Sequence, residues 1–80
     1  MAQINEKDVL RVIQDALNTD SKLTLDSTSE DVEEWDSLGH LGIVAALDKL
    51  FGGKTGDIRE MGNARSVQEI LQILRDNSLI

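Results

Sequence analysis

Apolar residues recur every three or four positions in three segments of the chain, at about 5–18, 37–51 and 66–77. This spacing places them along one face of an α-helix. β-branched residues do not alternate with polar ones, as they would in a half-buried strand. The predicted inward-facing residues are Val9, Leu10, Val12, Ile13, Ala16 and Leu17 in the first segment; Ile43, Val44, Leu47, Leu50 and Phe51 in the second; and Val67, Ile70, Leu71 and Leu74 in the third.

Each predicted helix starts at a side chain that can accept hydrogen bonds from free backbone N–H groups: Asn5, Asp36 and Ser66. Ser66 also has Glu69 three residues later, which is the spacing of a capping box. The second helix should stop at Gly52-Gly53, because glycine readily adopts the left-handed conformation that closes many helices.

Two less regular stretches connect the helices. Residues 19–36 are polar and long for a connection, so we expect them to be functional or partly wound. Their apolar anchors are Leu23, Leu25, Val32 and Trp35. Residues 54–65 support one short helical turn at about 57–61, with Ile58 and Met61 as anchors. The sequence therefore predicts an all-α fold: a small four-helix bundle with three main helices, a short third helix and a long first loop, in a single domain over residues 1–80.

Composition supports a small globular domain. The chain has 80 residues, of which 40% are hydrophobic and 29% charged, and it contains no cysteine. A domain of this length leaves much of its surface in water, so a deep active-site pocket is not expected. Without cysteine there is neither a disulfide framework nor a thiolate metal site.

No run of 18 apolar residues occurs, so no membrane-spanning helix is predicted. The start, MAQINEKD, lacks the basic and then apolar layout of a signal peptide. We therefore expect a cytoplasmic protein, and we expect it to be a monomer.

The net charge of −7 is unevenly distributed. No Lys or Arg occurs from Leu23 to Asp48. The acidic residues gathered in 26–36 are Asp26, Glu30, Asp31, Glu33, Glu34 and Asp36. Such a field repels nucleic acid and anionic membranes and attracts basic partners. A solvated loop that serves solubility is the simpler interpretation, but the run ends directly on a serine at the start of a helix.

Catalysis and metal binding are not predicted. Asp36, Ser37 and His40 lie within one helical turn, which cannot place an acid, a base and an oxyanion hole around one serine. We expect His40 at the surface or facing a partner, and a lone histidine is a poor metal site. A calcium-binding EF-hand loop starting at Asp26 would need glycine and glutamate where the chain has Asp31 and Ser37.

Ser37 is better suited to carry a phosphate ester. A helix N-terminus presents free N–H groups and the positive end of the helix dipole, which stabilises a nearby anion by about 0.3–1 kcal/mol. Capping by Ser37 itself is the alternative, but Asp36 can already serve as the cap. The Ser37 hydroxyl would then remain exposed next to a long loop.

The segment DSLGHLGIVAALDKLF, residues 36–51, resembles the modification site and second helix of acyl carrier proteins, in the phosphopantetheine-binding carrier family. The family pattern has Asp-Ser-Leu at a helix start, then apolar residues at helical spacing, and a Phe near the helix end. Asp36, Ser37, Leu38 and Phe51 match it in place and spacing. The resemblance also covers length, acidity, the long first loop, a weak third helix and the final amphipathic helix, and thus essentially the whole chain.

This resemblance implies that Ser37 carries 4′-phosphopantetheine, transferred from coenzyme A by a phosphopantetheinyl transferase. The thiol of the arm would hold an acyl or aminoacyl group as a thioester. A loading ligase and downstream synthase or transferase enzymes, of a fatty-acid, polyketide or other biosynthetic pathway, would be the partners. The carrier itself would catalyse nothing.

The residues around Ser37 can be interpreted beside this resemblance from their own chemistry. Leu38 and Leu41 are expected as exposed apolar contacts near the arm, with core positions as the alternative for both. Trp35 is expected to pin the loop onto the bundle. The residues expected to take part in partner recognition are Asp36, Leu38, Leu41, Glu33, Glu34 and Asp48.

The second helix departs from the pattern of fatty-acid carriers, which have several acids on it. Here Asp48 is its one acid, and Gly39 and Gly42 lie near its start. Each glycine costs roughly 1 kcal/mol relative to alanine in a helix, so we expect close approach by a partner or by the arm. A specialised carrier is therefore favoured over a housekeeping one. The alternative is an unmodified acidic helical adaptor that binds a basic protein.

Overall fold

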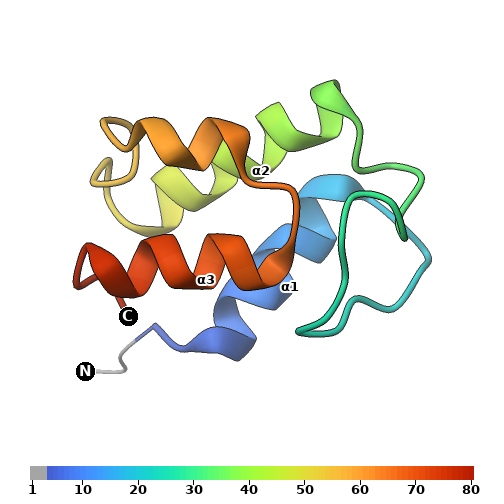
Figure 1. Ribbon diagram of the computed structural model, residues 1–80, viewed down its shortest axis with the longest axis horizontal. Helices are drawn as coiled ribbons and strands as arrows, with labels where there is room; N and C mark the ends of the chain where they lie inside the picture. Colours follow the sequence, from blue (N-terminus) through green and yellow to red (C-terminus); the bar gives the residue numbers. More distant parts are fainter. Residues whose placement is uncertain (1–3) are drawn as a thin grey trace.

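The computed structural model describes residues 4–80. Its elements, in chain order, are α1 (Glu6–Leu17), α2 (Ser37–Leu50), the 3₁₀-helix η1 (Arg59–Asn63) and α3 (Val67–Asp76). Figure 1 shows α1, α2 and α3 packed together, with the loop between α1 and α2 extending at one end. Residues 4–80 contain no strand, so the predicted all-α class is confirmed. The short third helix of the prediction is present only as five residues of 3₁₀-helix, so the four-helix bundle is not confirmed.

The start of α1 follows the predicted local chemistry. The Asn5 side chain accepts a hydrogen bond from the Asp8 backbone N–H at 3.0 Å, and the Asp8 carboxylate accepts from the Asn5 N–H at 3.1 Å. This pair is a complete capping box. Asn18 ends the helix in the left-handed conformation, with φ of 49°. Both the start and the end of α1 are therefore set by residues within one turn of them.

The ends of α2 are also as predicted. The Asp36 carboxylate accepts a hydrogen bond from the Gly39 N–H at 2.8 Å. The helix stops at Leu50, and Gly52 and Gly53 follow it with φ of 65° and 87°. Non-glycine residues rarely adopt these angles, so this pair fixes the point at which the chain turns away from α2.

The start of α3 forms only half of the predicted capping box. Ser66 Oγ accepts a hydrogen bond from the Glu69 N–H at 3.1 Å. The Glu69 carboxylate, however, accepts from the N–H of Arg65 at 2.8 Å rather than from that of Ser66. The glutamate thus holds the residue before the cap in place.

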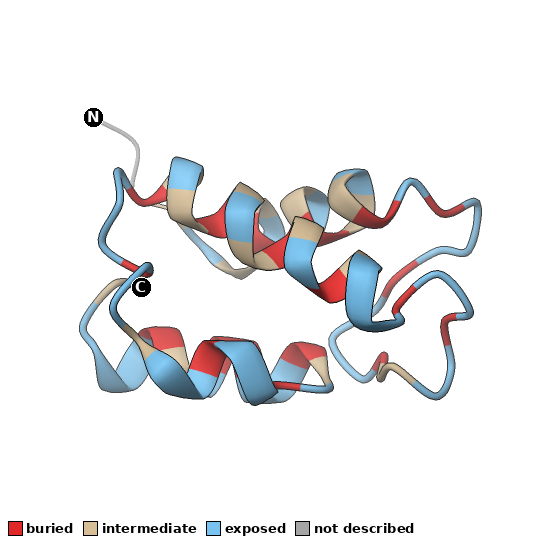
Figure 2. Ribbon diagram, turned by 90° about the horizontal axis from the view of Figure 1, so that it is seen from above, coloured by how far each residue is buried: buried red, intermediate tan, exposed pale blue. Residues whose placement is uncertain are grey.

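A single hydrophobic core lies between the helices. Figure 2 shows buried residues recurring along each helix and in the long loop. The buried core residues are Val9, Ile13, Leu17, Leu23, Val32, Trp35, Ile43, Leu47, Phe51, Met61, Ala64, Val67, Ile70, Leu71 and Leu74. All four predicted core residues of α3 are fully buried. Most of those predicted in α1 and α2 are buried too, and five are only partly buried: Leu10, Val12, Ala16, Val44 and Leu50. Leu25 is the exception among the loop anchors, because it is 40% exposed.

The first half of the long loop is held by one side chain of α1. The amide nitrogen of Gln14 donates to the carbonyl oxygens of Thr19 and Ser21, at 2.9 and 2.7 Å. Its amide oxygen accepts from the Leu23 N–H at 3.0 Å. Three backbone groups of an otherwise irregular segment are thereby satisfied without regular secondary structure.

The second half of the loop is paired with the start of α3. Ser29 N–H donates to the carbonyl of Arg65 at 2.7 Å, and Val67 N–H donates to the carbonyl of Ser27 at 3.0 Å. These bonds make an isolated antiparallel bridge between Thr28 and Ser66. The loop therefore contains turns rather than a helix, and it is fixed against a distant part of the chain.

The segment between α2 and α3 has one buried anchor in addition to those predicted. Thr55 is almost fully buried and its hydroxyl donates to the Asp48 carboxylate at 3.1 Å. Met61 is fully buried as expected, and Ile58 is partly buried. The helical turn lies two residues later than predicted, at η1. No helix within residues 4–80 has the length and apolar character needed to cross a membrane.

Candidate functional site

Ser37 is the first residue of α2, and its side chain is exposed. The capping position before it is occupied by Asp36, whose carboxylate binds the Gly39 N–H. The Ser37 hydroxyl makes no hydrogen bond to any residue in the described range 4–80. The serine is therefore not needed to cap the helix, and its oxygen is accessible.

Two shallow hollows meet at Ser37. The first has a volume of about 230 Å³ and is lined by Ser29, Trp35, Asp36, Ser37, His40 and Arg65. The second has a volume of about 310 Å³ and is lined by Ser37, His40, Leu41, Val44, Gly62 and Arg65. Ser37, His40 and Arg65 thus border both hollows. The lining of the first is about half polar and half apolar, whereas the second is mainly apolar and includes Leu41 and Val44.

His40 is buried, contrary to its predicted place at the surface or against a partner. Its Nδ1 accepts a hydrogen bond from Trp35 Nε1–H at 3.0 Å. Its Nε2 lies 2.7 Å from the carbonyl oxygen of Met61. Since a carbonyl only accepts, Nε2 carries the proton and the ring is neutral. The prediction was wrong because two partners, distant from each other in sequence, satisfy both ring nitrogens in the interior.

Trp35 pins the loop onto the bundle as predicted, and it does so through His40. The tryptophan side chain is buried, and its ring is nearly parallel to the imidazole, with an interplanar angle of 9°. The pair joins the end of the loop to α2, and Met61 joins the same imidazole to η1. Because both nitrogens of His40 are occupied, neither is available to accept the proton of Ser37.

Leu38 and Leu41 form an apolar surface on the first turns of α2. Leu38 is 78% exposed and Leu41 is 65% exposed. The alternative that Leu38 and Leu41 are core residues is therefore wrong, and the predicted exposure of both side chains is confirmed. Large apolar side chains this exposed on a small domain are typical of contact surfaces.

The two glycines of α2 differ in what surrounds them. A Cβ on Gly39 would lie 2.1 Å from the carbonyl oxygen of Glu34 and 2.9 Å from a methyl group of Leu17. A Cβ on Gly42 would lie 3.5 Å from the carbonyl oxygen of Ala16, which is an ordinary contact. The protein's own loop therefore approaches Gly39 closely, and no such approach exists at Gly42 within residues 4–80.

The predicted acidic recognition residues have different surroundings. Glu33 and Glu34 are exposed, and Glu34 accepts a hydrogen bond from the Thr19 hydroxyl at 2.8 Å. Asp48 is partly buried and binds Thr55. It is 11 residues after Ser37 on the same helix, about 16 Å along the axis at 1.5 Å per residue. Glu33, Glu34 and Asp36 thus lie in the chain segment that leads into Ser37, and Asp48 lies at the other end of α2.

Arg65 borders both hollows beside Ser37, and the sequence reasoning did not identify it. It lies far from Ser37 in the sequence, just before α3. The backbone bond between Ser29 N–H and the Arg65 carbonyl brings the two regions together. The only sequence signal is that Arg65 directly precedes a predicted helix cap, which does not indicate what it faces.

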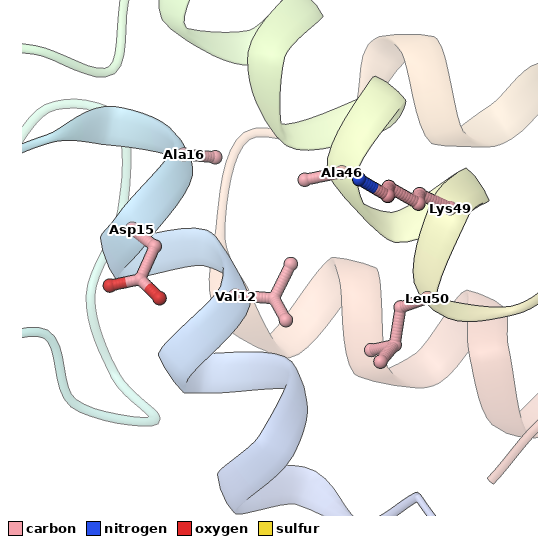
Figure 3. Close-up of a pocket in the computed structure, with 6 residues that line it drawn as sticks. All are labelled: Val12, Asp15, Ala16, Ala46, Lys49 and Leu50. Atoms are coloured by element: carbon pink, nitrogen blue, oxygen red, sulfur yellow. The ribbon is translucent and has the colours of Figure 1, made fainter.

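A larger hollow lies elsewhere, between α1 and α2. Its volume is about 500 Å³, and Figure 3 shows side chains of the two helices facing each other across it. Its lining residues are Val12, Asp15, Ala16, Ala46, Lys49 and Leu50. None of them borders the hollows at Ser37, and most are aliphatic. Within residues 4–80, no group of three or more His, Cys, Asp or Glu side chains is arranged to hold a metal ion.

No protein-family model, curated protein or solved structure matches this chain.

Proposed function

We propose that this chain is a carrier protein in which the Ser37 hydroxyl bears a 4′-phosphopantetheine arm. The observation that supports this most directly is that Ser37 is exposed at the start of α2 while Asp36 does the capping. The Ser37 side chain is thus not the cap of the helix. The resemblance of residues 36–51 to acyl carrier proteins supplies the identity of the attached group.

In the attachment step, the Ser37 oxygen attacks the phosphorus of coenzyme A that bears the pantetheine group. A phosphoester bond forms to Ser37, and the bond from that phosphorus to the bridging oxygen of the pyrophosphate breaks. Adenosine 3′,5′-bisphosphate leaves, and the serine proton passes to a base. His40 is not that base, because Trp35 and Met61 occupy both of its nitrogens.

The arm would then hold an acyl or aminoacyl group as a thioester on its terminal thiol, and would present it to partner enzymes. The chain contains no cysteine, so the arm would supply its only thiol. Exposed Leu38 and Leu41 provide an apolar surface beside the attachment point. Glu33, Glu34 and Asp36 give the approach to it a negative charge that favours basic partners.

We further propose that the chain is a monomeric cytoplasmic carrier of the four-helix type, with η1 in the place of the short third helix. It would serve a specialised pathway, because α2 carries one acid, Asp48, where fatty-acid carriers have several.

Incubation of the purified chain with coenzyme A and a broad-specificity phosphopantetheinyl transferase tests the proposal. Intact-mass measurement is expected to show a gain of one phosphopantetheine group. Ser37→Ala should abolish the gain, because the accepting oxygen is lost. Ser29→Ala is the matched control, since Ser29 borders the same hollow, and it should load like the native chain. Absence of loading on the folded native chain contradicts the proposal.

An unmodified adaptor is the second candidate. The loop that leads into α2 is acidic, and bonds to Gln14 and to the start of α3 hold it in place. A fixed acidic surface can bind a basic protein without any attached group. This candidate becomes the favoured one if the native chain stays unmodified in the mass experiment.

A further inference from the structure

Arg65 has a fixed backbone. Its N–H donates to the Glu69 carboxylate at 2.8 Å, and its carbonyl accepts from the Ser29 N–H at 2.7 Å. Neither bond involves the Arg65 side chain. The position from which the side chain extends is therefore set by α3 and the long loop, independently of the guanidinium group.

The guanidinium group is only partly used. One of its nitrogens, Nη1, donates to the carbonyl of Ala64 at 3.1 Å. Guanidinium has five N–H donors, and no carboxylate within residues 4–80 forms an ion pair with Arg65. The side chain is exposed and borders both hollows beside Ser37. It thus retains donors and a positive charge next to the exposed serine.

The charge around Ser37 makes this cation notable. The chain has no Lys or Arg from Leu23 to Asp48, and among residues 4–80 Arg65 is the one Lys or Arg that lines either hollow. Asp36 is the one acidic residue that lines them. A phosphate ester on Ser37 would lie next to the Asp36 carboxylate, and a nearby positive charge would offset this repulsion. Planar guanidinium can offer two parallel N–H donors to phosphate oxygens.

We propose that Arg65 binds the phosphate group carried on Ser37. This contact would hold the first group of the arm at the place where the two hollows meet. This inference rests on the proposed function, because the phosphate is the first group of the arm. In this role Arg65 is a positioning residue: it takes no part in the transfer of the arm and acts on the attached ester.

The test uses the full 80-residue chain made by chemical synthesis with phosphoserine at position 37. This places a phosphate on the same oxygen without any transferase. Free phosphoserine loses its second proton near pH 6, and a neighbouring cation favours the doubly charged form. The ³¹P chemical shift, followed against pH, is expected to show a proton affinity roughly threefold or more weaker in the native background than in Arg65→Gln.

Two further variants complete the experiment. Arg65→Lys keeps the charge and should restore most of the effect, whereas Arg59→Gln removes an exposed arginine that lines neither hollow and should change nothing. In the native background, the side-chain Nε–H signal of Arg65 should shift with the same midpoint as the phosphate, a readout that needs no substitution. Equal midpoints in the native and Arg65→Gln chains, or an Arg65 signal that does not follow the phosphate, overturn the inference. Failure of enzymatic loading counts against the proposed function alone.

Discussion

α2 and α3 both begin with a capping oxygen that accepts an N–H three residues later, and both have a serine at that start. In α3 the serine is the cap itself: Ser66 binds the Glu69 N–H, and its neighbours pair with the long loop. In α2 the cap is Asp36, and the hydroxyl of Ser37 after it makes no hydrogen bond within residues 4–80. A shift of one position separates a serine that caps a helix from one whose side chain is exposed and unbonded in the described part of the chain.

The two helix starts also differ in how far the rest of the chain covers them. The start of α3 is enclosed by backbone bonds to Ser27 and Ser29. The start of α2 has one covered side, where the Glu34 carbonyl packs on Gly39, and one open side, where Leu38 and Leu41 are exposed. The start of α3 thus contributes to the stability of the fold, whereas the start of α2 is accessible on one side. Substitutions can test this difference.

The largest effect is expected at Gly39. Gly39→Ala places a methyl group against the backbone of Glu34 and should lower the free energy of unfolding by about 2–3 kcal/mol. Gly42→Ala is the matched control in the same helix. It removes the entropic cost of glycine without a clash, and should raise the free energy of unfolding by up to about 1 kcal/mol. Urea titration followed by circular dichroism measures both. Equal destabilisation by the two changes would contradict the close approach of the loop.

An intermediate effect is expected at Trp35 and His40, the hydrogen-bonded pair that joins the end of the loop to α2. Trp35→Phe removes the donor to His40 Nδ1 and leaves a buried acceptor unsatisfied. The free energy of unfolding should fall by about 1–3 kcal/mol. A double-mutant cycle with His40→Gln, measured by urea titration, separates this bond from the loss of ring volume. If the two changes proved additive, the bond would contribute nothing to stability.

The smallest effects distinguish the serines themselves. Ser66→Ala removes a cap and should lower the free energy of unfolding by about 1 kcal/mol. Ser37→Ala should alter it by no more than about 0.5 kcal/mol, because the hydroxyl makes no bond within the described chain. Thermal unfolding of the two variants side by side checks this contrast. A stability loss in Ser37→Ala as large as that in Ser66→Ala would mean that Ser37 has a structural role.

The helices could be predicted from the sequence because their determinants are local. Asn5, Asp36 and Ser66 cap within one turn, and the apolar faces follow the helical repeat. The short turn was displaced by two residues, because η1 is a 3₁₀-helix whose position depends on burial of Met61 and not on a repeat. Local patterns also could not show that Leu25 is left exposed.

The site could be predicted only in part. Exposure of Ser37 followed from the cap before it, which is a local relation. The burial of His40 depends on Trp35 and on the distant carbonyl of Met61, so its polar character alone suggested the surface. Arg65 borders the same two hollows as Ser37, and a backbone pairing between the loop and the start of α3 places it there. Such pairings have no signature in a sequence of this length.

The contact between the Glu34 carbonyl and Gly39 restricts the directions from which a catalyst can reach Ser37. At about 100° of rotation per residue, Gly39 points nearly opposite to Ser37, whereas Leu41 projects only about 40° away from it. The chain itself thus covers the side of the helix start that faces away from Ser37, and the open side carries Leu38 and Leu41. In the proposed carrier, an enzyme acting on Ser37 would therefore approach over these two leucines.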